Sequence, residues 1–418
     1  MIYLETKDKD FSRKLKRILE KRAQVSQEVL ERVEEIFQEV KKQGIKAVLK
    51  YAREYDGFVG KEADLQVKPK EFLQAEKSLS EKEKTAIKKA LKRIERFHKN
   101  QLPGGFQLRE KGGYLKERWI PLERVGIYIP AGKYPLASTV LMTVIPARLA
   151  GVKEIILTSP APGGKIHPAI LYSAKLAGAD VVYKLGGAQA IFALSLGVKP
   201  VKKVDKIVGP GGIYVSTAKV YAYSLGLVGI DTLAGPSEVV ILADGSAPLE
   251  FALSDLQAQL EHGKDSWGFL LSNKQSFLLE AKARLKKEKG NLVLIFCSGK
   301  KEMIELANQI APEHLELQVR KPESWADRIT TAGAVFLGAW SPVAIGDYLA
   351  GTNHCLPTGG RARFDSPLGV WDFLHRQSQI YFSLGRFSTL CEPARDFAHL
   401  EGLKEHARSL EIRRRSQN

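Results

Sequence analysis

The sequence predicts an α/β protein built from two parallel-sheet units. From about residue 124, short apolar segments alternate with longer amphipathic ones, which is typical of strands connected by helices. The same alternation restarts at residue 238. A chain of 418 residues is also long for one hydrophobic core, so more than one domain is expected.

The elements follow in order along the chain. Residues 1–103 are predicted to be mainly helical, and Ser80 with Glu83 forms a capping box that opens a long helix. Residues 106–122 are predicted to form a hairpin that turns at Gly112-Gly113. The first parallel unit has predicted strands at 125–129, 154–158, 180–185 and 206–208, and helices at 138–149, 167–177, 188–196 and 213–225. The second has predicted strands at 239–242, 269–271, 292–296 and near 315 and 334, and helices at 248–262, 275–287 and 301–310.

Both units are interpreted as Rossmann-like. The restart makes a duplication one interpretation, although no residue-level repeat is convincing. The chain beyond Gly346 is predicted to be rich in loops and to end in helices with a polar tail. We divide the chain into an N-terminal helical arm (1–22), a discontinuous first α/β domain (23–123 and 236–366), a second α/β domain (124–235) and a C-terminal tail (367–418). The tail has little predicted core, so it is expected to dock on a partner subunit.

Composition narrows the class of protein. No apolar run is long enough to cross a membrane, and residues 1–22 lack the apolar block of a signal peptide. An odd number of cysteines, three, argues for a reducing compartment, so a cytoplasmic enzyme is expected. The net charge of +17 admits a nucleic-acid-binding protein. However, the charge is spread along the chain and no zinc-finger or aromatic RNA-binding motif is present, so no nucleic-acid partner is expected.

The segment Asp255 to Gly263 carries the first candidate site. Three leucines at helical spacing would face a core, whereas Gln259 and His262 would share another face and could hold one ligand together. This pattern favours a metal or polar ligand. A polar helix end that happens to contain a histidine explains the same residues.

Further carboxylates and histidines gather in the second half of the chain. Glu313 and His314 are predicted on a loop that enters a strand, a position where ligand sites occur, most of all at the carboxyl ends of strands. A glutamate can take a proton from water and a histidine from an alcohol, but a histidine that stabilises a helix end is equally compatible. The segment that contains Asp347 and His354 is polar and rich in glycine, which is typical both of a ligand-binding loop and of an ordinary turn. The spacing of Glu401 and His406, taken alone, indicates a solvent-exposed tail.

Two more features bear on cofactors. Gly209-Pro210-Gly211-Gly212 follows a predicted strand and precedes a helix, so its backbone N–H groups could meet a phosphate. A plain tight turn accounts for the same four residues. A Walker A sequence is absent, and no Gly-x-Gly-x-x-Gly motif stands at a strand-to-helix turn.

Seven motifs in order give the chain a resemblance to the histidinol dehydrogenase family from about Arg124 onward. They are residues 125–130 (VGIYIP), 186–190 (GGAQA), 234–239 (AGPSEV), 259–263 (QLEHG), 311–314 (APEH), 351–354 (GTNH) and 401–403 (EGL) with His406. The resemblance implies oxidation of L-histidinol to L-histidine through histidinal, with two NAD and one zinc ion, as the last step of histidine biosynthesis. It also implies a homodimer of intertwined subunits, in which the C-terminal tail completes the neighbour's site.

The resemblance also assigns roles to residues. The implied zinc ligands are Gln259, His262, Asp347 and His406, with Glu313 activating water and His314 as the general base. The implied substrate contacts are Ser237, Gln259, His262, His314, Asp347, Glu401 and His406. Tyr128 and Gln189 match the family's NAD contacts, whereas the third position carries Gly212 in place of the usual asparagine.

Two other functions compete with this interpretation. One is a relative with the same fold and zinc site that oxidises another polar alcohol. The other is a zinc-dependent hydrolase that uses Glu313 and water without NAD. The set Ser237, Glu401 and His406 favours histidinol as the substrate.

Overall fold

The computed structural model describes residues 1–22, 25–131, 134–232, 235–261, 263–285 and 291–415. The chain divides into two compact units, Met1–Gln101 with Leu122–Phe373, and Leu102–Pro121 with Leu374–Asn418. Each unit is described by itself. The first contains two parallel sheets wrapped by helices, which confirms the predicted α/β class.

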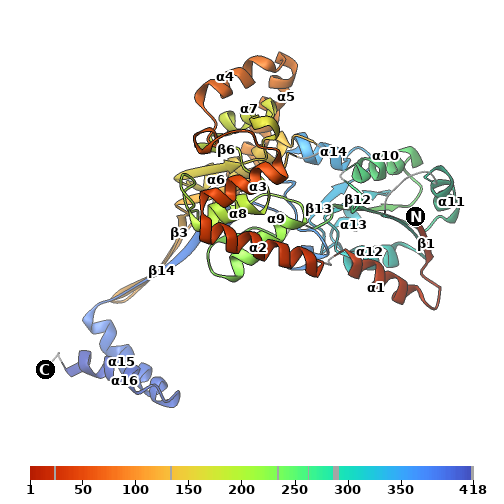
Figure 1. Ribbon diagram of the computed structural model, residues 1–418. Coiled ribbons are helices and arrows are strands. Elements are labelled where there is room, and N and C mark those ends of the chain that lie inside the picture. Colours follow the sequence, from red (N-terminus) through yellow and green to blue (C-terminus); the bar gives the residue numbers. More distant parts are fainter. Residues whose placement is uncertain (23–24, 132–133, 233–234, 262, 286–290, 416–418) are drawn as a thin grey trace. The chain divides into compact units, whose positions relative to one another are not determined.

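The first sheet of this unit has six parallel strands in the order β1-β11-β10-β9-β12-β13. They are β1 (Ile2–Glu5), β9 (Glu238–Ala243), β10 (Trp267–Ser272), β11 (Asn291–Phe296), β12 (His314–Gln318) and β13 (Ala334–Leu337). The central strands carry buried apolar side chains on both faces of the sheet, as expected where helices cover both sides. One face packs on α1 (Phe11–Lys21) and α12 (Lys300–Ile310), and the other on α10 (Leu249–Leu260) and α11 (Gln275–Arg284) (Figure 1).

The second sheet has five parallel strands in the order β6-β5-β4-β7-β8. They are β4 (Arg124–Tyr128), β5 (Glu154–Thr158), β6 (Val181–Tyr183), β7 (Lys206–Val208) and β8 (Gly229–Ile230). The chain runs outward from β4 through β5 to β6, then returns to the other side of β4 for β7 and β8. This reversal makes a topological switch point between the carboxyl ends of β4 and β7, where open α/β sheets bind ligands.

Two groups of helices surround this second sheet. One group comprises α2 (Gln27–Gln43), α3 (Ile45–Asp56), α8 (Gly187–Leu196) and α9 (Ile213–Ser224). The other comprises α4 (Pro69–Ser78), α5 (Glu81–His98), α6 (Ala137–Ala150) and α7 (Pro168–Ala177). The predicted capping box is present at the start of α5, where Ser80 Oγ accepts from Glu83 N and Glu83 Oε2 accepts from Ser80 N. The remaining short elements are η1 (Glu62–Asp64), η2 (Lys99–Gln101), η3 (Pro162–Gly164), α13 (Glu323–Ala326), α14 (Val343–Ile345), the π-turn η4 (Gly346–Ala350), η5 (Arg361–Arg363) and η6 (Val370–Phe373).

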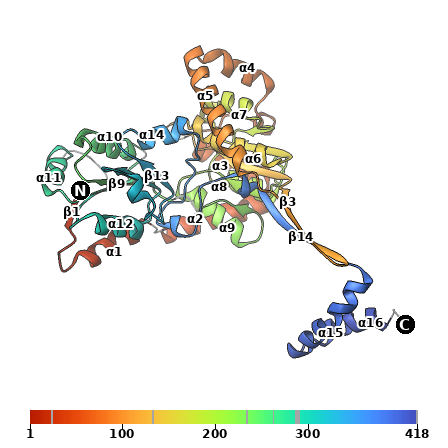
Figure 2. The ribbon, with the colours of Figure 1, turned by 180° about the vertical axis from the view of Figure 1, so that it is seen from behind.

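The second unit is an antiparallel sheet followed by two helices. Strands β2 (Phe106–Glu110) and β3 (Gly113–Pro121) form the predicted hairpin, and β14 (Leu374–Phe382) pairs with β3 on its other side. Helices α15 (Leu384–Leu400) and α16 (Lys404–Arg415) pack on each other, as both ribbon views show (Figure 2).

Three strands of the structure were not predicted: β1, β14 and the two-residue β8 (Gly229–Ile230). Residues 2–5 form β1 where helix was expected, and residues 374–382 form β14 where a loop-rich segment was expected. The predicted domain boundaries at residues 22, 123, 235 and 366 stay predictions. No helix in the described part of the chain combines the length and apolar character needed to span a bilayer.

Candidate functional site

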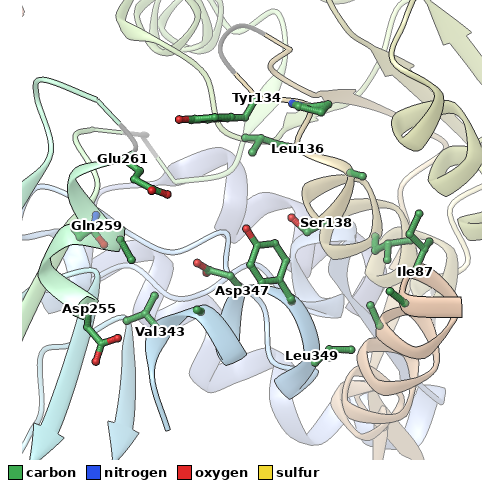
Figure 3. Close-up of a pocket in the computed structure, with 18 residues that line it drawn as sticks. Ile87, Tyr134, Leu136, Ser138, Asp255, Gln259, Glu261, Val343, Asp347 and Leu349 are labelled. Atoms are coloured by element: carbon green, nitrogen blue, oxygen red, sulfur yellow. The ribbon is translucent and has the colours of Figure 1, made fainter. Parts of the chain in front are cut away.

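A cavity of about 580 Å³ opens in the first unit. It is lined by the middle of α5, the segment leading into α6 with the first turns of that helix, the end of α10, and the segment through α14 and η4 (Figure 3). Its polar lining includes the side chains of Asp255, Gln259, Glu261, Ser138 and Asp347. This is the size of a small-molecule site with a few converging polar groups.

Gln259 and Asp347 bring two of the predicted zinc ligands to this cavity (Figure 3). Gln259 lies in the last turn of α10 and is 3% exposed, and its Nε2 has no hydrogen-bond partner among the described residues. The predicted core spacing of α10 is confirmed, because Leu253 and Leu256 are buried in the core and Leu260 is partly buried against it. Burial raises the pKa of Asp347 to about 7. The partly buried carboxylate of Asp347 could hold a cation, and the unsatisfied N–H of Gln259 could donate to an acceptor of a polar ligand.

Glu313 lies on the loop that enters β12, and His314 is the first residue of that strand, next to the loop on which the sequence placed both. The αL conformation of Ala311 (φ 49°) ends α12 and turns the chain into this loop. Glu313 Oε2 accepts from the backbone N–H of Glu238 at 2.9 Å, and both Glu313 and His314 are buried. Burial raises the pKa of Glu313 well above its usual range, and the nearby carboxylates of Glu238 and Asp347 act in the same direction.

A loop that enters a strand lies at the amino edge of a sheet, and not at the carboxyl ends of strands, where ligand sites are most common. His314 is the first residue of β12 and pairs with Val239 at the start of β9, so the pair lies at the amino edge of the six-stranded sheet. Helix α10 runs back along the sheet, so its last turn brings Gln259 toward the same edge. His314 Nε2 lies 3.9 Å from Asp347 Oδ1, which links the catalytic candidates to the cavity.

His354 contacts the backbone of Asp347. Its Nδ1 lies 3.0 Å from the backbone oxygen of Asp347, and its Nε2 lies 3.2 Å from Thr139 Oγ1 at the start of α6. Thr139 is 2% exposed. The contacts therefore connect the η4 turn that carries Asp347 to helix α6.

A buried ion pair that the sequence did not reveal lies behind the catalytic candidates. Arg22 Nη1 contacts Glu238 Oε2 at 2.8 Å, and Arg22 Nη2 donates to the backbone oxygen of Ile310. Glu238 Oε1 accepts from Gly359 N at 3.1 Å, and burial raises the pKa of Glu238 to about 7. These contacts join the end of α1, β9, the end of α12 and the loop at 359. No local signal marks the pair, because its members are 216 residues apart.

Two of the predicted NAD contacts lie at the carboxyl edge of the five-stranded sheet. Tyr128 ends β4, and its hydroxyl accepts from Gly187 N at 3.2 Å. Gln189, in the first turn of α8, is fully buried and its Nε2 donates to Asp56 Oδ2 at 3.0 Å. Asp56 was not identified from the sequence, since it ends a helix remote from every motif.

The third predicted NAD contact, Gly212, is the N-cap of α9. The turn before it lies beside Tyr128, because a Cβ at Gly209 (φ 110°) would lie 2.2 Å from the backbone oxygen of Tyr128. The turn at 209–212 is therefore at the switch point. A Cβ at Gly212 would meet no heavy atom within 4 Å, so an asparagine would fit there.

The other predicted site residues are distributed as follows. Ser237 directly precedes β9 at the amino edge, and its backbone oxygen accepts from Trp267 N. His262 lies outside the described residues. Glu401 caps α15 and His406 lies in α16, both exposed in the second unit. Within the described ranges, no three or more His, Cys, Asp or Glu side chains are grouped as a metal site.

Comparisons with known proteins agree on one family. The family model described as "Histidinol dehydrogenase" matches residues 19–414. A histidinol dehydrogenase of Geobacter sulfurreducens is 40% identical over 99% of this chain and 100% of its own length. One from Thermus thermophilus is 44% identical over 92% of this chain and 95% of its own. A crystal structure of histidinol dehydrogenase from Elizabethkingia anophelis matches with a TM-score of 0.91 and 34% identity, and it covers 100% of this chain and 99% of that one.

Proposed function

The chain belongs to the histidinol dehydrogenase family and is an NAD-dependent oxidoreductase, and from this premise we propose that it oxidises L-histidinol to L-histidine through histidinal. The observation that carries the proposal is the buried Glu313-His314 pair beside a cavity lined by Gln259 and Asp347. This arrangement offers a base for an alcohol and a base for water next to a polar binding site.

His314 is the general base in both oxidations. Its Nδ1 lies 3.2 Å from the backbone oxygen of Glu238. A carbonyl oxygen only accepts, so in the neutral ring Nδ1 carries the proton and Nε2 carries the lone pair. Nε2 is the atom nearer Asp347 and removes the hydroxyl proton of the alcohol as the carbon loses a hydride.

Glu313 acts between the two oxidations. The aldehyde cannot lose a second hydride toward the acid until water has added to its carbonyl carbon. Glu313 takes the proton from that water, and His314 then takes a proton from the resulting hydrate as the second hydride leaves. In sum, alcohol and water give the acid, with two hydrides transferred. Retaining the aldehyde between the steps protects a reactive intermediate.

The residues that line the cavity fit a zinc ion. Asp347 supplies a carboxylate oxygen, and Gln259, which is buried at the cavity, supplies an amide oxygen. We propose that His262 and His406 complete the set, with His406 coming from a partner subunit. Bound zinc would supply a Lewis acid and a template that orients the imidazole and amine of the substrate.

NAD is proposed to bind at the switch point near Tyr128, Gln189 and Gly212, and when bound it accepts the hydrides. The N-terminus of α9 and the turn before it present backbone N–H groups suited to a phosphate. Ser237, Glu401 and His406 are proposed substrate contacts in addition to the cavity residues.

A homodimer accounts for the second unit. Its described strands and helices leave large apolar side chains open, including Ile380 at 70% and Leu400 at 81% exposure. Exposed apolar clusters of this kind mark interaction surfaces. We propose that a second copy covers them, which brings Glu401 and His406 to the neighbour's cavity, and that the enzyme works in the cytoplasm.

A substrate comparison tests the proposed activity. NADH formation is measured with L-histidinol, with the corresponding aldehyde and with other polar amino alcohols at equal concentration. The proposal expects L-histidinol and histidinal to have the highest kcat/KM. A higher kcat/KM for another alcohol would assign the chain to a different substrate.

A further inference from the structure

The side-chain amide of Gln189 has a hydrogen bond at its nitrogen but none at its oxygen among the described residues. The side chain is fully buried in the first turn of α8, and its Nε2 donates to Asp56 at 3.0 Å. Its Oε1 is also buried and has no hydrogen-bond partner among the described residues. A buried acceptor without a donor is costly, so the atom is suited to receive a hydrogen bond from a ligand.

Asp56 determines which atom of the Gln189 amide remains without a hydrogen bond. Its Oδ2 accepts both from Gln189 Nε2 and from the backbone N–H of Gly186 at 2.9 Å. Burial raises the pKa of Asp56 to about 6, with both hydrogen bonds opposing the shift, so the group is ionised at neutral pH. An ionised carboxylate only accepts, and therefore the NH₂ of Gln189 must face Asp56 and the oxygen must face away.

The same contacts anchor the loop before α8. Gly186 N is held by Asp56, and Gly187 N donates to the hydroxyl of Tyr128 at the carboxyl end of β4. A Cβ at Gly186 would lie 2.6 Å from Asp56 Oδ1, so the loop and the carboxylate are in close contact. Asp56 thus fixes both the backbone and the side chain at this edge of the sheet.

We propose that Asp56 is a positioning residue for the cofactor, which orients Gln189 so that Oε1 accepts a hydrogen bond from a donor group of NAD. The carboxamide and the ribose hydroxyls of NAD are donors of this kind. The inference rests on the proposed cofactor site at Tyr128 and Gln189. Asp56 itself acts through Gln189 and need not touch the cofactor.

Direct NAD binding to zinc-loaded protein, measured by calorimetry, tests the inference. Asp56→Asn allows the amide of Gln189 to turn around, so it is expected to weaken NAD binding roughly fivefold, the value of about one hydrogen bond. The KM for L-histidinol is expected to stay within about twofold. Asp180→Asn is the matched control, because Asp180 also accepts from a backbone N–H, that of Ile155, but at the amino edge of the same sheet.

Exchanging the amide and the carboxylate between positions 56 and 189 distinguishes a positioning role from a purely structural one. Gln189→Glu alone places two carboxylates together and is expected to weaken NAD binding, although it leaves the Asp56–Gly186 hydrogen bond in place. In the double variant D56N/Q189E the new amide donates to the new carboxylate, and the second carboxylate oxygen again offers an acceptor. The double variant is therefore expected to bind NAD more tightly than either single variant.

The outcomes separate this inference from the proposed cofactor site. If Gln189→Ala binds NAD as the unaltered protein does, the cofactor site is wrong and the inference falls with it. If Gln189→Ala weakens binding but Asp56→Asn does not, the cofactor site stands and the role of Asp56 is overturned. Weak binding in D56N/Q189E, equal to that of the worse single variant, also overturns the role.

Discussion

The backbone oxygen of Glu238 lies 3.2 Å from Nδ1 of His314, and the backbone N–H of the same residue donates to Glu313 at 2.9 Å. One residue of β9 therefore holds both catalytic candidates through its main chain. The side chain of Glu238 is in turn held by Arg22 and by Gly359 N. The main chain of Glu238 therefore contributes to the orientation of the His314 ring, together with the carboxylate of Glu313, whose Oε2 lies 3.5 Å from Nδ1.

Replacing His314 should impair both oxidations, since the same Nε2 takes the proton in each. We expect His314→Gln to lower the rate of NADH formation from L-histidinol and from histidinal by about 10² to 10⁴, the usual contribution of a general base. His375→Gln, an exposed histidine of β14, is the control. Initial rates with each substrate check the prediction. A variant that lost only one of the two activities would contradict the shared role.

Replacing Glu313 should separate the two oxidations. Glu313→Gln keeps an oxygen that can accept from Glu238 N, so the local structure is expected to persist. The variant cannot take the proton from water, and the second oxidation should slow by about 10² or more while the first continues. The ratio of NADH to consumed L-histidinol should fall from two toward one, with aldehyde captured by a carbonyl reagent. Equal loss of both steps would argue against water activation by Glu313.

Zinc affinity should depend on two residues of the cavity and not on a third. Gln259→Ala and Asp347→Asn each remove a proposed ligand, and we expect each to weaken zinc binding by at least about tenfold, because even supporting residues of metal sites have effects of that size. Asp255→Asn alters a carboxyl that lines the same cavity outside the ligand set and serves as the control. Competition with a chelating indicator measures all three. If Asp255→Asn lost more zinc affinity than Asp347→Asn, the metal site would have to be placed at Asp255 instead.

Gly212→Asn should strengthen NAD binding. The position is open to a side chain and has φ −64°, which any residue adopts without strain. A new hydrogen bond contributes about 1 kcal/mol, so the dissociation constant for NAD is expected to fall about fivefold. Calorimetry compares the variant with the unaltered protein. An unchanged constant would mean that the side chain at 212 makes no contact with the cofactor.

Much of the fold was visible in the sequence, because its parallel strands and helices carry strong apolar patterns. The strands at 154–158 and 206–208 match the structure residue for residue. β14 was missed because its sequence, LHRQSQIYF, has a weak apolar pattern: most of its residues are exposed and none is buried. Its partner strand β3 is also far away in the chain. β1 was missed because it is a four-residue strand directly followed by charged residues of helical character.

The candidate site was only partly visible. Gln259, Glu313, His314 and Asp347 stand in motifs, and the structure brings them to one edge of the sheet. Three other residues, Arg22, Glu238 and Asp56, are buried or partly buried and contact partners that are distant in the sequence. Asp56 and its partner Gln189, for example, are 133 residues apart. Nothing in their local sequence indicates that these charges are buried, and so only the folded chain reveals what they hold in place.

The most direct test of the proposed function is the stoichiometry of NADH formation from L-histidinol, measured with intact protein, with protein stripped by a chelator and after zinc is returned. The account predicts two NADH and one L-histidine per L-histidinol, activity lost on chelation, and activity restored by zinc. One NADH per substrate with the aldehyde as end product, or full activity in the zinc-free protein, would contradict it.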